Sequence, residues 1–398
     1  MPNVNAHRSR QLLAITRGRI AGVALAAGLG FAAPAYAGNG APPAAAAAAA
    51  AAEEPSVASI TLTGHAADLW WADFNPDGTR AVTASSDRTA RIWDVVTGQT
   101  LLTLSGHDEA VRVAIFSPNG GQIATACRNG LAKIWDAKTG KEIATLNGHK
   151  EMIEGVAFSP DSERLVTASR DGSAILWDAK TGKQLAELKG HTEWLSGVEF
   201  SADGARIVTS SSDKTARVWD GKTGAAVITL EGHDGLVTSA TFSPDGTQVA
   251  TSSSDKTGRL WDAKTGQTIK TLSGHERAVL RAAYSPDGGR VVTVSSDKTG
   301  RIYDTASGDL VAKMEGHHKR LIPRVMYSRD GTRIVTASHD KSASVWDAKT
   351  GAHIVKLAGH MKEVDGAEFS PDGKKVLTAS YDRTARVWDV PAAPPKGE

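Results

Sequence analysis

The sequence predicts an all-β protein made of eight consecutive repeats, each folded as a four-stranded antiparallel meander. A Gly-His pair and a Trp-Asp or Tyr-Asp pair recur eight times with a period of 42 residues, apart from one step of 43. A fixed period in this range marks a repeat architecture. Each repeat also contains four short apolar runs separated by turn residues, which is the pattern of short antiparallel strands.

The first 37 residues have the pattern of an export signal. Four arginines lie within residues 8–19, an apolar run of small residues follows at Ile20–Ala33, and Ala35-Tyr36-Ala37 precedes Gly38. We expect cleavage near Ala37/Gly38, and the Ala/Gly-rich composition indicates a bacterium and therefore the periplasm. The alternative is an uncleaved membrane anchor, although the apolar run is short for a bilayer span.

Two further segments are of low complexity. Residues 38–55 consist of a Gly/Pro-rich start, a run of alanines and an acidic end, so we expect a disordered linker. Residues 391–398 form a Pro-containing tail, also expected to be disordered. The repeats occupy residues 56–390, between these two segments.

The fifth repeat shows the expected strands. They are Leu236–Phe242, Gln248–Ser252, Gly258–Trp261 and Gln267–Leu272. The first two are joined by Ser-Pro-Asp-Gly at residues 243–246, where Pro presets φ and Gly takes the left-handed position of a turn. No segment of the repeats has the pattern of a ten-residue helix.

These motifs carry a resemblance to a known family. The string GH…SPDG…SSDKTxRxWD, as in Thr251–Asp262 (TSSSDKTGRLWD), resembles the WD40 repeat, and eight copies cover residues 56–390. The resemblance implies an eight-bladed β-propeller with four strands per blade. It also implies a role in binding other proteins.

The two ends of the repeat region predict how the ring closes. Ser59–Leu62 reads as an outer strand without a blade of its own, whereas the residues after Asp389 cannot supply one. We therefore expect the amino-terminal strand to complete the eighth blade, which would remove an open sheet edge. The alternative is a seven-bladed ring with one repeat outside it.

Four polar or aromatic residues recur at fixed spacing, and the resemblance implies that they form a hydrogen-bonded structural tetrad inside each blade. The expected members are His65, Thr83, Asp87, Trp93; His107, Thr125, Trp135; His149, Thr167, Asp171, Trp177; His191, Thr209, Asp213, Trp219; His233, Thr251, Asp255, Trp261; His275, Thr293, Asp297; His318, Thr336, Asp340, Trp346; and His360, Thr378, Asp382, Trp388. Asn129 replaces the Asp in the second repeat and Tyr303 replaces the Trp in the sixth. Because the Thr/His/Asp set occurs in almost every repeat, it indicates structure and not a catalytic triad.

Composition argues against several functions. The net charge is +2, which gives no electrostatic reason to expect nucleic acid as a partner. Cys127 is the single cysteine, so no internal disulfide and no multi-cysteine metal site can form. The sequence contains no phosphate-binding loop, nucleophile elbow or zinc-protease motif. We therefore expect no catalytic residues, no cofactor and no metal, and a monomeric protein.

The positions that differ between repeats are the candidates for partner binding. In WD40 proteins one face of the ring is built by the residues after Gly-His and by the residue before the turn Asp. Aromatic, Met and Arg side chains there are of the types enriched at interface centres. The candidates are Trp70, Arg112, Arg128, Met152, Arg170, Trp194, His339 and Tyr381. The alternative is sequence drift, with the tryptophans filling gaps between blades; Trp71, on the other side of its strand, is expected in the core.

Three hypotheses about function follow. The first is a non-enzymatic scaffold of the bacterial envelope that presents one propeller face to a protein or peptide. The second is a periplasmic enzyme like the quinoprotein propellers. The segment Trp135–Ile143 (WDAKTGKEI) resembles in part the docking repeats of those proteins. The third is a membrane-tethered signalling or assembly scaffold, if the leader is retained; membrane contact is expected only in that case.

Overall fold

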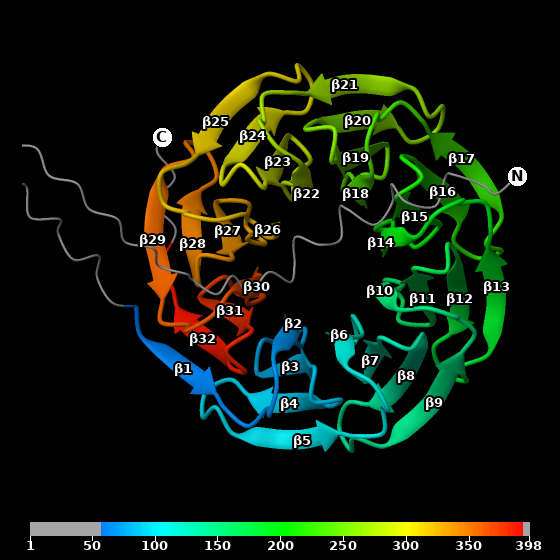
Figure 1. The fold of residues 1–398 in the computed structure, drawn as a ribbon, viewed down its shortest axis with the longest axis vertical. Helices are drawn as coiled ribbons and strands as arrows, with labels where there is room; N and C mark the ends of the chain where they lie inside the picture. Colours follow the sequence, from blue (N-terminus) through cyan, green and yellow to red (C-terminus); the bar gives the residue numbers. More distant parts are fainter. Residues whose placement is uncertain (1–56, 393–398) are drawn as a thin grey trace, which may run out of the picture. The chain divides into compact units, whose positions relative to one another are not determined.

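The structure, a computed structural model, describes residues 57–392. The thirty-two regular elements of this part of the chain are all β-strands, arranged in eight four-stranded antiparallel sheets around a central axis (Figure 1). The predicted fold class, an eight-bladed propeller, is therefore confirmed. The signal and linker predicted for residues 1–55, and most of the tail predicted for residues 391–398, lie outside the described residues.

Each blade runs from an inner strand at the ring axis to an outer strand at the rim. The inner strands are β2 (Leu69–Phe74), β6 (Val111–Phe116), β10 (Ile153–Phe158), β14 (Leu195–Phe200), β18 (Val237–Phe242), β22 (Val279–Tyr284), β26 (Arg324–Tyr327) and β30 (Val364–Phe369). The second strands are β3 (Arg80–Ser85), β7 (Gln122–Cys127), β11 (Arg164–Ser169), β15 (Arg206–Ser211), β19 (Gln248–Ser253), β23 (Arg290–Ser295), β27 (Arg333–Ser338) and β31 (Lys375–Ser380).

The third strands carry the Trp-Asp or Tyr-Asp pair, and the fourth lie at the rim. The third strands are β4 (Ala90–Asp94), β8 (Leu131–Asp136), β12 (Ala174–Asp178), β16 (Ala216–Asp220), β20 (Gly258–Asp262), β24 (Gly300–Asp304), β28 (Ser342–Asp347) and β32 (Ala385–Asp389). The outer strands are β5 (Thr100–Leu104), β9 (Glu142–Asn147), β13 (Gln184–Leu188), β17 (Ala226–Leu230), β21 (Thr268–Leu272), β25 (Leu310–Met314), β29 (His353–Ala358) and, from the start of the chain, β1 (Ser59–Leu62).

Local chemistry places the turns where the sequence predicts them, so the strands of the fifth blade differ from the expected ranges by no more than one residue at an end. In the turn after β18, the Ser243 hydroxyl donates to the Asp245 carboxylate at 2.6 Å, and Gly246 has φ = 68°. After β20, the Asp262 carboxylate accepts the backbone N–H groups of Lys264 (2.9 Å) and Thr265 (2.6 Å). Carboxylates that accept nearby N–H groups in this way stabilise tight turns.

The core lies between neighbouring sheets. One cluster joins Val208, Val218 and Leu230 of the fourth blade to Phe242 and Trp261 of the fifth, and equivalent clusters fill the other gaps. Since every sheet buries both faces against its neighbours, the blades hold one another around the ring. Burial of apolar area at these contacts supplies the main stabilisation of the fold.

The ring closes through the amino-terminal strand. β1 pairs with β32 in antiparallel register, with Ser59 opposite Trp388 and Leu62 opposite Ala385. Leu62 is 1% exposed and belongs to a cluster that also includes Leu69 of the first blade and Val387 of the eighth. The predicted closure of the eighth blade by the first strand is confirmed, and eight blades, not seven, make up the ring.

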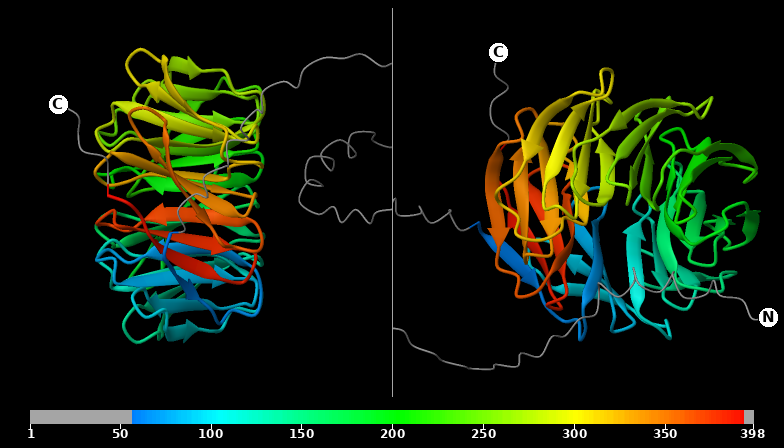
Figure 2. Two further views of the ribbon diagram at one scale, coloured as in Figure 1. Left: turned by 90° about the vertical axis from the view of Figure 1, so that its left-hand side faces the viewer. Right: turned by 45° about the horizontal axis from the view of Figure 1, so that its top comes forward.

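The ring has two faces, because the eight sheets lie side by side at one level (Figure 2). Each inner strand begins just after a Gly-His pair and ends at the Ser-Pro-Asp-Gly turn or its variant. We call the side with the Gly-His loops the Gly-His face and the opposite side the turn face. The seventh blade differs from the others because β26 has four residues where the other inner strands have six. Pro323, which has no backbone N–H to donate, directly precedes it.

Candidate functional site

The tetrad of the fifth blade forms one chain of hydrogen bonds. The Trp261 ring N–H donates to the Thr251 hydroxyl at 2.8 Å, Thr251 Oγ1 lies 2.7 Å from His233 Nε2, and His233 Nδ1 lies 2.7 Å from Asp255 Oδ2. A neutral imidazole with its proton on Nδ1 satisfies every partner. Burial lowers the pKa of His233, against the opposing effect of Asp255, which favours this neutral form. The chain is enclosed within the blade and offers no surface for a ligand.

The departures from the tetrad pattern have local consequences. In the second blade, Nδ1 of His107 is buried without a hydrogen-bond partner, and burial, followed by the nearby Lys133 charge, lowers the pKa of His107 to about 4. Asn129 instead accepts a hydrogen bond from the Cys127 thiol. In the sixth blade, the Tyr303 hydroxyl donates to the Ser273 carbonyl at 2.9 Å. In the seventh, His318 is the histidine that bonds to Thr336, at 2.7 Å.

The candidate partner-binding residues lie together on the Gly-His face. The backbone N–H of the residue before each turn Asp donates to a carbonyl of the post-His loop; Arg170 N bonds to Met152 O at 2.9 Å, and Tyr381 N bonds to Glu363 O at 3.0 Å. This backbone link brings the two groups of candidate positions to the same edge of each blade.

Seven side chains connect across this face, and we call them the aromatic–arginine belt. The belt consists of His339, Tyr381, Trp70, Arg112, Glu154, Arg170 and Trp194. The ring of His339 lies 6.0 Å from that of Tyr381, which meets the Trp70 ring edge-to-face at 4.7 Å. The Arg112 guanidinium lies 3.9 Å from the centre of the Trp70 ring. All three distances are in the range of favourable aromatic and cation–π contacts.

The second half of the belt is held by one carboxylate. Glu154 pairs with Arg112 at 3.7 Å and also with Arg170, whose guanidinium lies 5.4 Å from the Trp194 ring centre. The belt thus crosses the inner ends of blades seven, eight, one, two, three and four. All four aromatic rings and all three charged side chains are partly exposed, so they are ordered by one another and still reachable by a partner.

Two of the predicted partner-binding residues lie outside this chain of contacts. Conversely, two residues that were not among the predicted ones contact members of the belt. Arg128 is exposed and Met152 is half-buried beside the belt. Glu154 bridges two arginines, and the Asp365 carboxylate accepts a hydrogen bond from His339 Nε2 at 3.2 Å. Both carboxylates occupy the same post-His positions as the candidates, so a search for charge complementarity to Arg112 and Arg170 could have found them.

At the positions that correspond to the belt, the fifth and sixth blades carry uncharged, non-aromatic side chains. The residues before the turn Asp in the fifth and sixth blades are Ser254 and Ser296, and the second positions of their inner strands are Thr238 and Leu280. At these positions the face is therefore asymmetric, with the belt on one arc and uncharged, non-aromatic side chains on the other; the post-His loop of the sixth blade still carries the exposed Glu276 and Arg277.

Charged residues near the ring axis were not predicted. The Arg324 guanidinium lies 3.6 Å from the centre of the Trp71 ring, and Trp71 packs between two core clusters. Asp73 accepts the Phe116 N–H of the next blade at 2.7 Å, and Glu368 accepts the Phe74 N–H across the closure of the ring. These carboxylates fasten successive blades. The sequence does show these residues as charged positions within strands that are otherwise apolar, and that pattern could have indicated them.

Comparison with known proteins identifies the repeat. The family model for the WD domain, G-beta repeat, matches eight consecutive segments. They are residues 57–94, 98–136, 140–178, 182–220, 224–262, 266–304, 308–347 and 351–389. The chain belongs to the WD40 repeat family. Proteins of this family are typically scaffolds for protein interactions.

Individual relatives match this WD40 protein over short stretches or as a fold. It is 45% identical over 42 residues to the serine-threonine kinase receptor-associated protein of Homo sapiens, 11% of this chain and 12% of that protein. It is 46% identical over 41 residues to the eukaryotic translation initiation factor 3 subunit I of Phaeosphaeria nodorum, 10% of this chain and 12% of that protein. The chain thus matches only about an eighth of the length of these relatives.

A solved structure matches most of the propeller. The crystal structure of the computationally designed Ika8 protein has a TM-score of 0.74 and 28% sequence identity, covering 83% of this chain and 98% of that one. Within residues 57–392, no group of three or more His, Cys, Asp or Glu side chains is arranged to hold a metal ion. The same residues include no helix of the length and apolarity needed to cross a bilayer.

The Asp73–Glu368 pair gives the WD40 ring a pH dependence that can be tested. Burial raises the pKa of Asp73 from 3.8 to about 7, and burial together with Asp73 raises the pKa of Glu368. Between pH 4 and about 7 these two carboxyl groups bind more protons in the folded protein than in the unfolded chain. The contribution of this pair to stability therefore falls as the pH rises from about 4 to about 7, by on the order of 1–3 kcal/mol, whereas buried histidines such as His233, whose pKa is lowered, contribute in the opposite direction.

Asp73→Asn is expected to remove most of this decrease. The amide oxygen can still accept the Phe116 N–H, but it carries no charge at any pH. The variant should match the wild type at about pH 4 and exceed its stability at about pH 8, measured by urea unfolding. Asp309→Asn, at an exposed position, is the control. Equal pH slopes in the Asp73 variant and the wild type would contradict the assignment.

Proposed function

We propose that this WD40 propeller is a non-enzymatic binding module that holds a protein or peptide partner on the Gly-His face, at the aromatic–arginine belt. The observation that carries the proposal is the continuous contact from His339 to Trp194. Trp, Tyr and Arg are the residue types that contribute most to binding energy at protein interfaces. Here they are held in place before a partner arrives, which lowers the entropic cost of binding.

The export pattern of residues 1–37 supports a place of action in the bacterial envelope. We extend the proposal accordingly: the leader is cleaved at Ala37/Gly38, and the propeller acts as a monomeric scaffold in the periplasm. The mass of the protein recovered from the periplasmic fraction tests this part separately. A mature chain beginning at Gly38 is expected, and a full-length chain retained in membranes would contradict it.

The binding proposal is tested by capture and by affinity measurement. Wild type, a belt variant (Trp70→Ala/Arg170→Ala/Trp194→Ala) and a control variant (Ser254→Ala/Ser296→Ala) are first shown to be folded by circular dichroism. Each is then used to capture partners from an envelope extract, and the partner is purified for titration. Wild type and control should bind equally, whereas the belt variant should lose at least about tenfold in affinity. Equal binding by all three would move the site away from the belt.

A further inference from the structure

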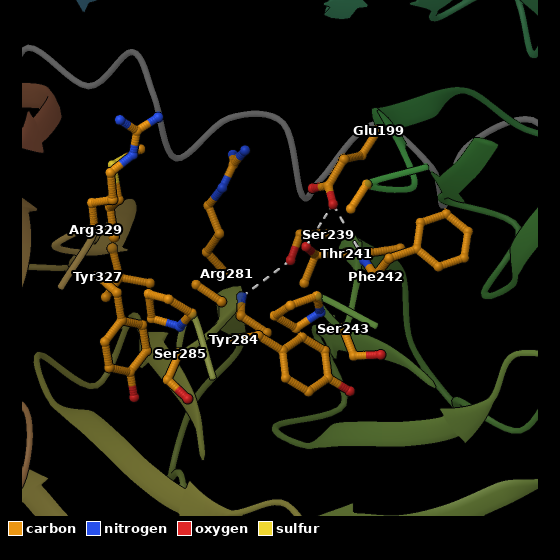
Figure 3. A pocket seen from close by; sticks show the side chains of 18 of the residues that line it. Glu199, Ser239, Thr241, Phe242, Ser243, Arg281, Tyr284, Ser285, Tyr327 and Arg329 are labelled. Carbon is orange, nitrogen blue, oxygen red and sulfur yellow. Dashed lines mark hydrogen bonds between the residues drawn. The ribbon is translucent and has the colours of Figure 1, made fainter. Parts of the chain in front are cut away.

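A pocket on the turn face has a different chemistry from the belt. It has a volume of about 490 Å³ and lies at the axial ends of the fourth to seventh blades. Its lining includes Glu199, Arg281, Tyr284, Met326, Tyr327 and Arg329 (Figure 3). Because it lies at the opposite ends of the inner strands from the Gly-His loops, it is separate from the binding site proposed above.

Two arginines supply the positive charge of this pocket. Arg281 projects from β22, and Arg329 stands in the turn of the seventh repeat, at the position held by Pro in six other repeats. Figure 3 shows both guanidinium groups directed toward the same side of the pocket. No hydrogen bond or ion pair joins either group to another residue in the part of the chain that the structure describes.

Two carboxylates, Glu199 and Asp365, favour the charged form of Arg281 from a distance, but neither forms an ion pair with it in the described part of the chain. Glu199 already accepts the Thr241 hydroxyl at 2.9 Å and the Phe242 N–H at 3.3 Å. Burial raises the pKa of Glu199 to about 7, so its charge is incomplete at neutral pH. Arg324, close to Arg281, adds a further positive charge. The guanidinium of Arg281 is half-buried without a hydrogen-bonded partner among the described residues, which is costly, and an incoming anion would offset that cost. Arg329 is exposed at the mouth of the pocket and can reach the same anion from the solvent side.

The walls of the pocket are largely apolar. Phe242, Pro244 and Pro286 line it together with the rings of Tyr284 and Tyr327, and Met326 is 40% exposed at its edge. Met326 belongs to the short strand β26, and it also lines two adjoining cavities. A flexible thioether next to aromatic rings suits an apolar group of variable shape.

We propose that this pocket binds a carboxylate attached to an apolar body, with Arg281 and Arg329 holding the carboxylate and Met326, Tyr284 and Tyr327 contacting the apolar part. An arginine can bind a carboxylate through two parallel hydrogen bonds, whereas the ring and thioether surfaces favour a hydrocarbon or aromatic group beside it. A free organic acid and the carboxyl terminus of a peptide that ends in an apolar residue share this chemistry.

The test compares each acid with its uncharged amide. The probes are 3-phenylpropionate with 3-phenylpropionamide, and acetyl-Ala-Ala-Phe with a free or an amidated carboxyl terminus. They are titrated into the protein by calorimetry or by NMR. At least one acid should bind, and its amide should bind at least about tenfold more weakly. Binding of both acids assigns a general carboxylate site, and binding of the peptide acid alone assigns a peptide terminus.

Matched variants complete the test. Arg281→Gln and Arg329→Gln should each weaken binding of the acid at least about tenfold, whereas Lys374→Gln, in an exposed turn of the same face, should leave it unchanged. Trp70→Ala should also leave it unchanged, which separates this proposal from the belt. Equal binding of acid and amide, unchanged binding by the arginine variants, equally tight binding of inorganic phosphate, or no acid binding at about 10 mM would overturn the proposal.

Discussion

Leu62→Asp is expected to prevent closure of the ring and to lower the free energy of unfolding by roughly 4 kcal/mol or more. Leu62 is 1% exposed and packs in the cluster between the eighth and first blades. A carboxylate there would be buried without a cationic partner, which is among the most destabilising changes a core can undergo. Without β1, strand β32 would become an open edge, so the variant should also self-associate.

Thr63→Asp is the matched control, since it introduces the same charge one residue later at an exposed position. Urea unfolding and light scattering are the measurements. The control should be as stable and monodisperse as the wild type. A Leu62→Asp protein that unfolds at the wild-type urea concentration would show that the β1–β32 pairing contributes little to the ring.

Thr251→Val should cost roughly 3–5 kcal/mol. The substitution preserves the shape of the side chain but removes the hydroxyl that receives the Trp261 indole N–H at 2.8 Å and contacts His233 at 2.7 Å. Both partners are buried, so each would lose its hydrogen bond without gaining water. An unsatisfied buried polar group costs about 1–3 kcal/mol.

The sixth blade supplies the comparison for this prediction. Thr293 contacts His275 at 2.9 Å, but no indole donates to it, because Tyr303 stands at the Trp position and its hydroxyl donates to the Ser273 carbonyl. Thr293→Val should therefore leave only one buried group unsatisfied and cost about half as much. Equal losses in the two variants, measured by urea unfolding, would show that the indole hydrogen bond does not contribute separately.

Most of the fold follows from residues that repeat. The period of 42 residues predicts eight blades, and the isolated run Ser59–Leu62 predicts where the first strand pairs. The 22-residue spacing between His318 and Asp340 predicts which of two adjacent histidines faces Thr336, the contact that the structure shows. These features depend on the spacing between residues along the chain, which can be read directly from the sequence.

The contacts of the candidate site could not be predicted in the same way. Tyr381 and Trp70 belong to the last and first blades, and their 4.7 Å contact exists only because the ring closes. Position in the repeat selects Arg112 and Arg170, but their shared bond to Glu154 depends on how far one blade is rotated from the next. The positive pocket around Arg281 likewise combines residues from four blades.

Because β1 pairs with β32, the arrangement of the blades in the ring does not depend on which blade contains the ends of the chain. Ser59 and Trp388 are neighbours in one sheet although almost the whole propeller lies between them in sequence. Since each outer strand is joined to the next inner strand by a short loop, we expect that a circularly permuted chain, opened in one of these loops and joined at its present ends, would form the same ring.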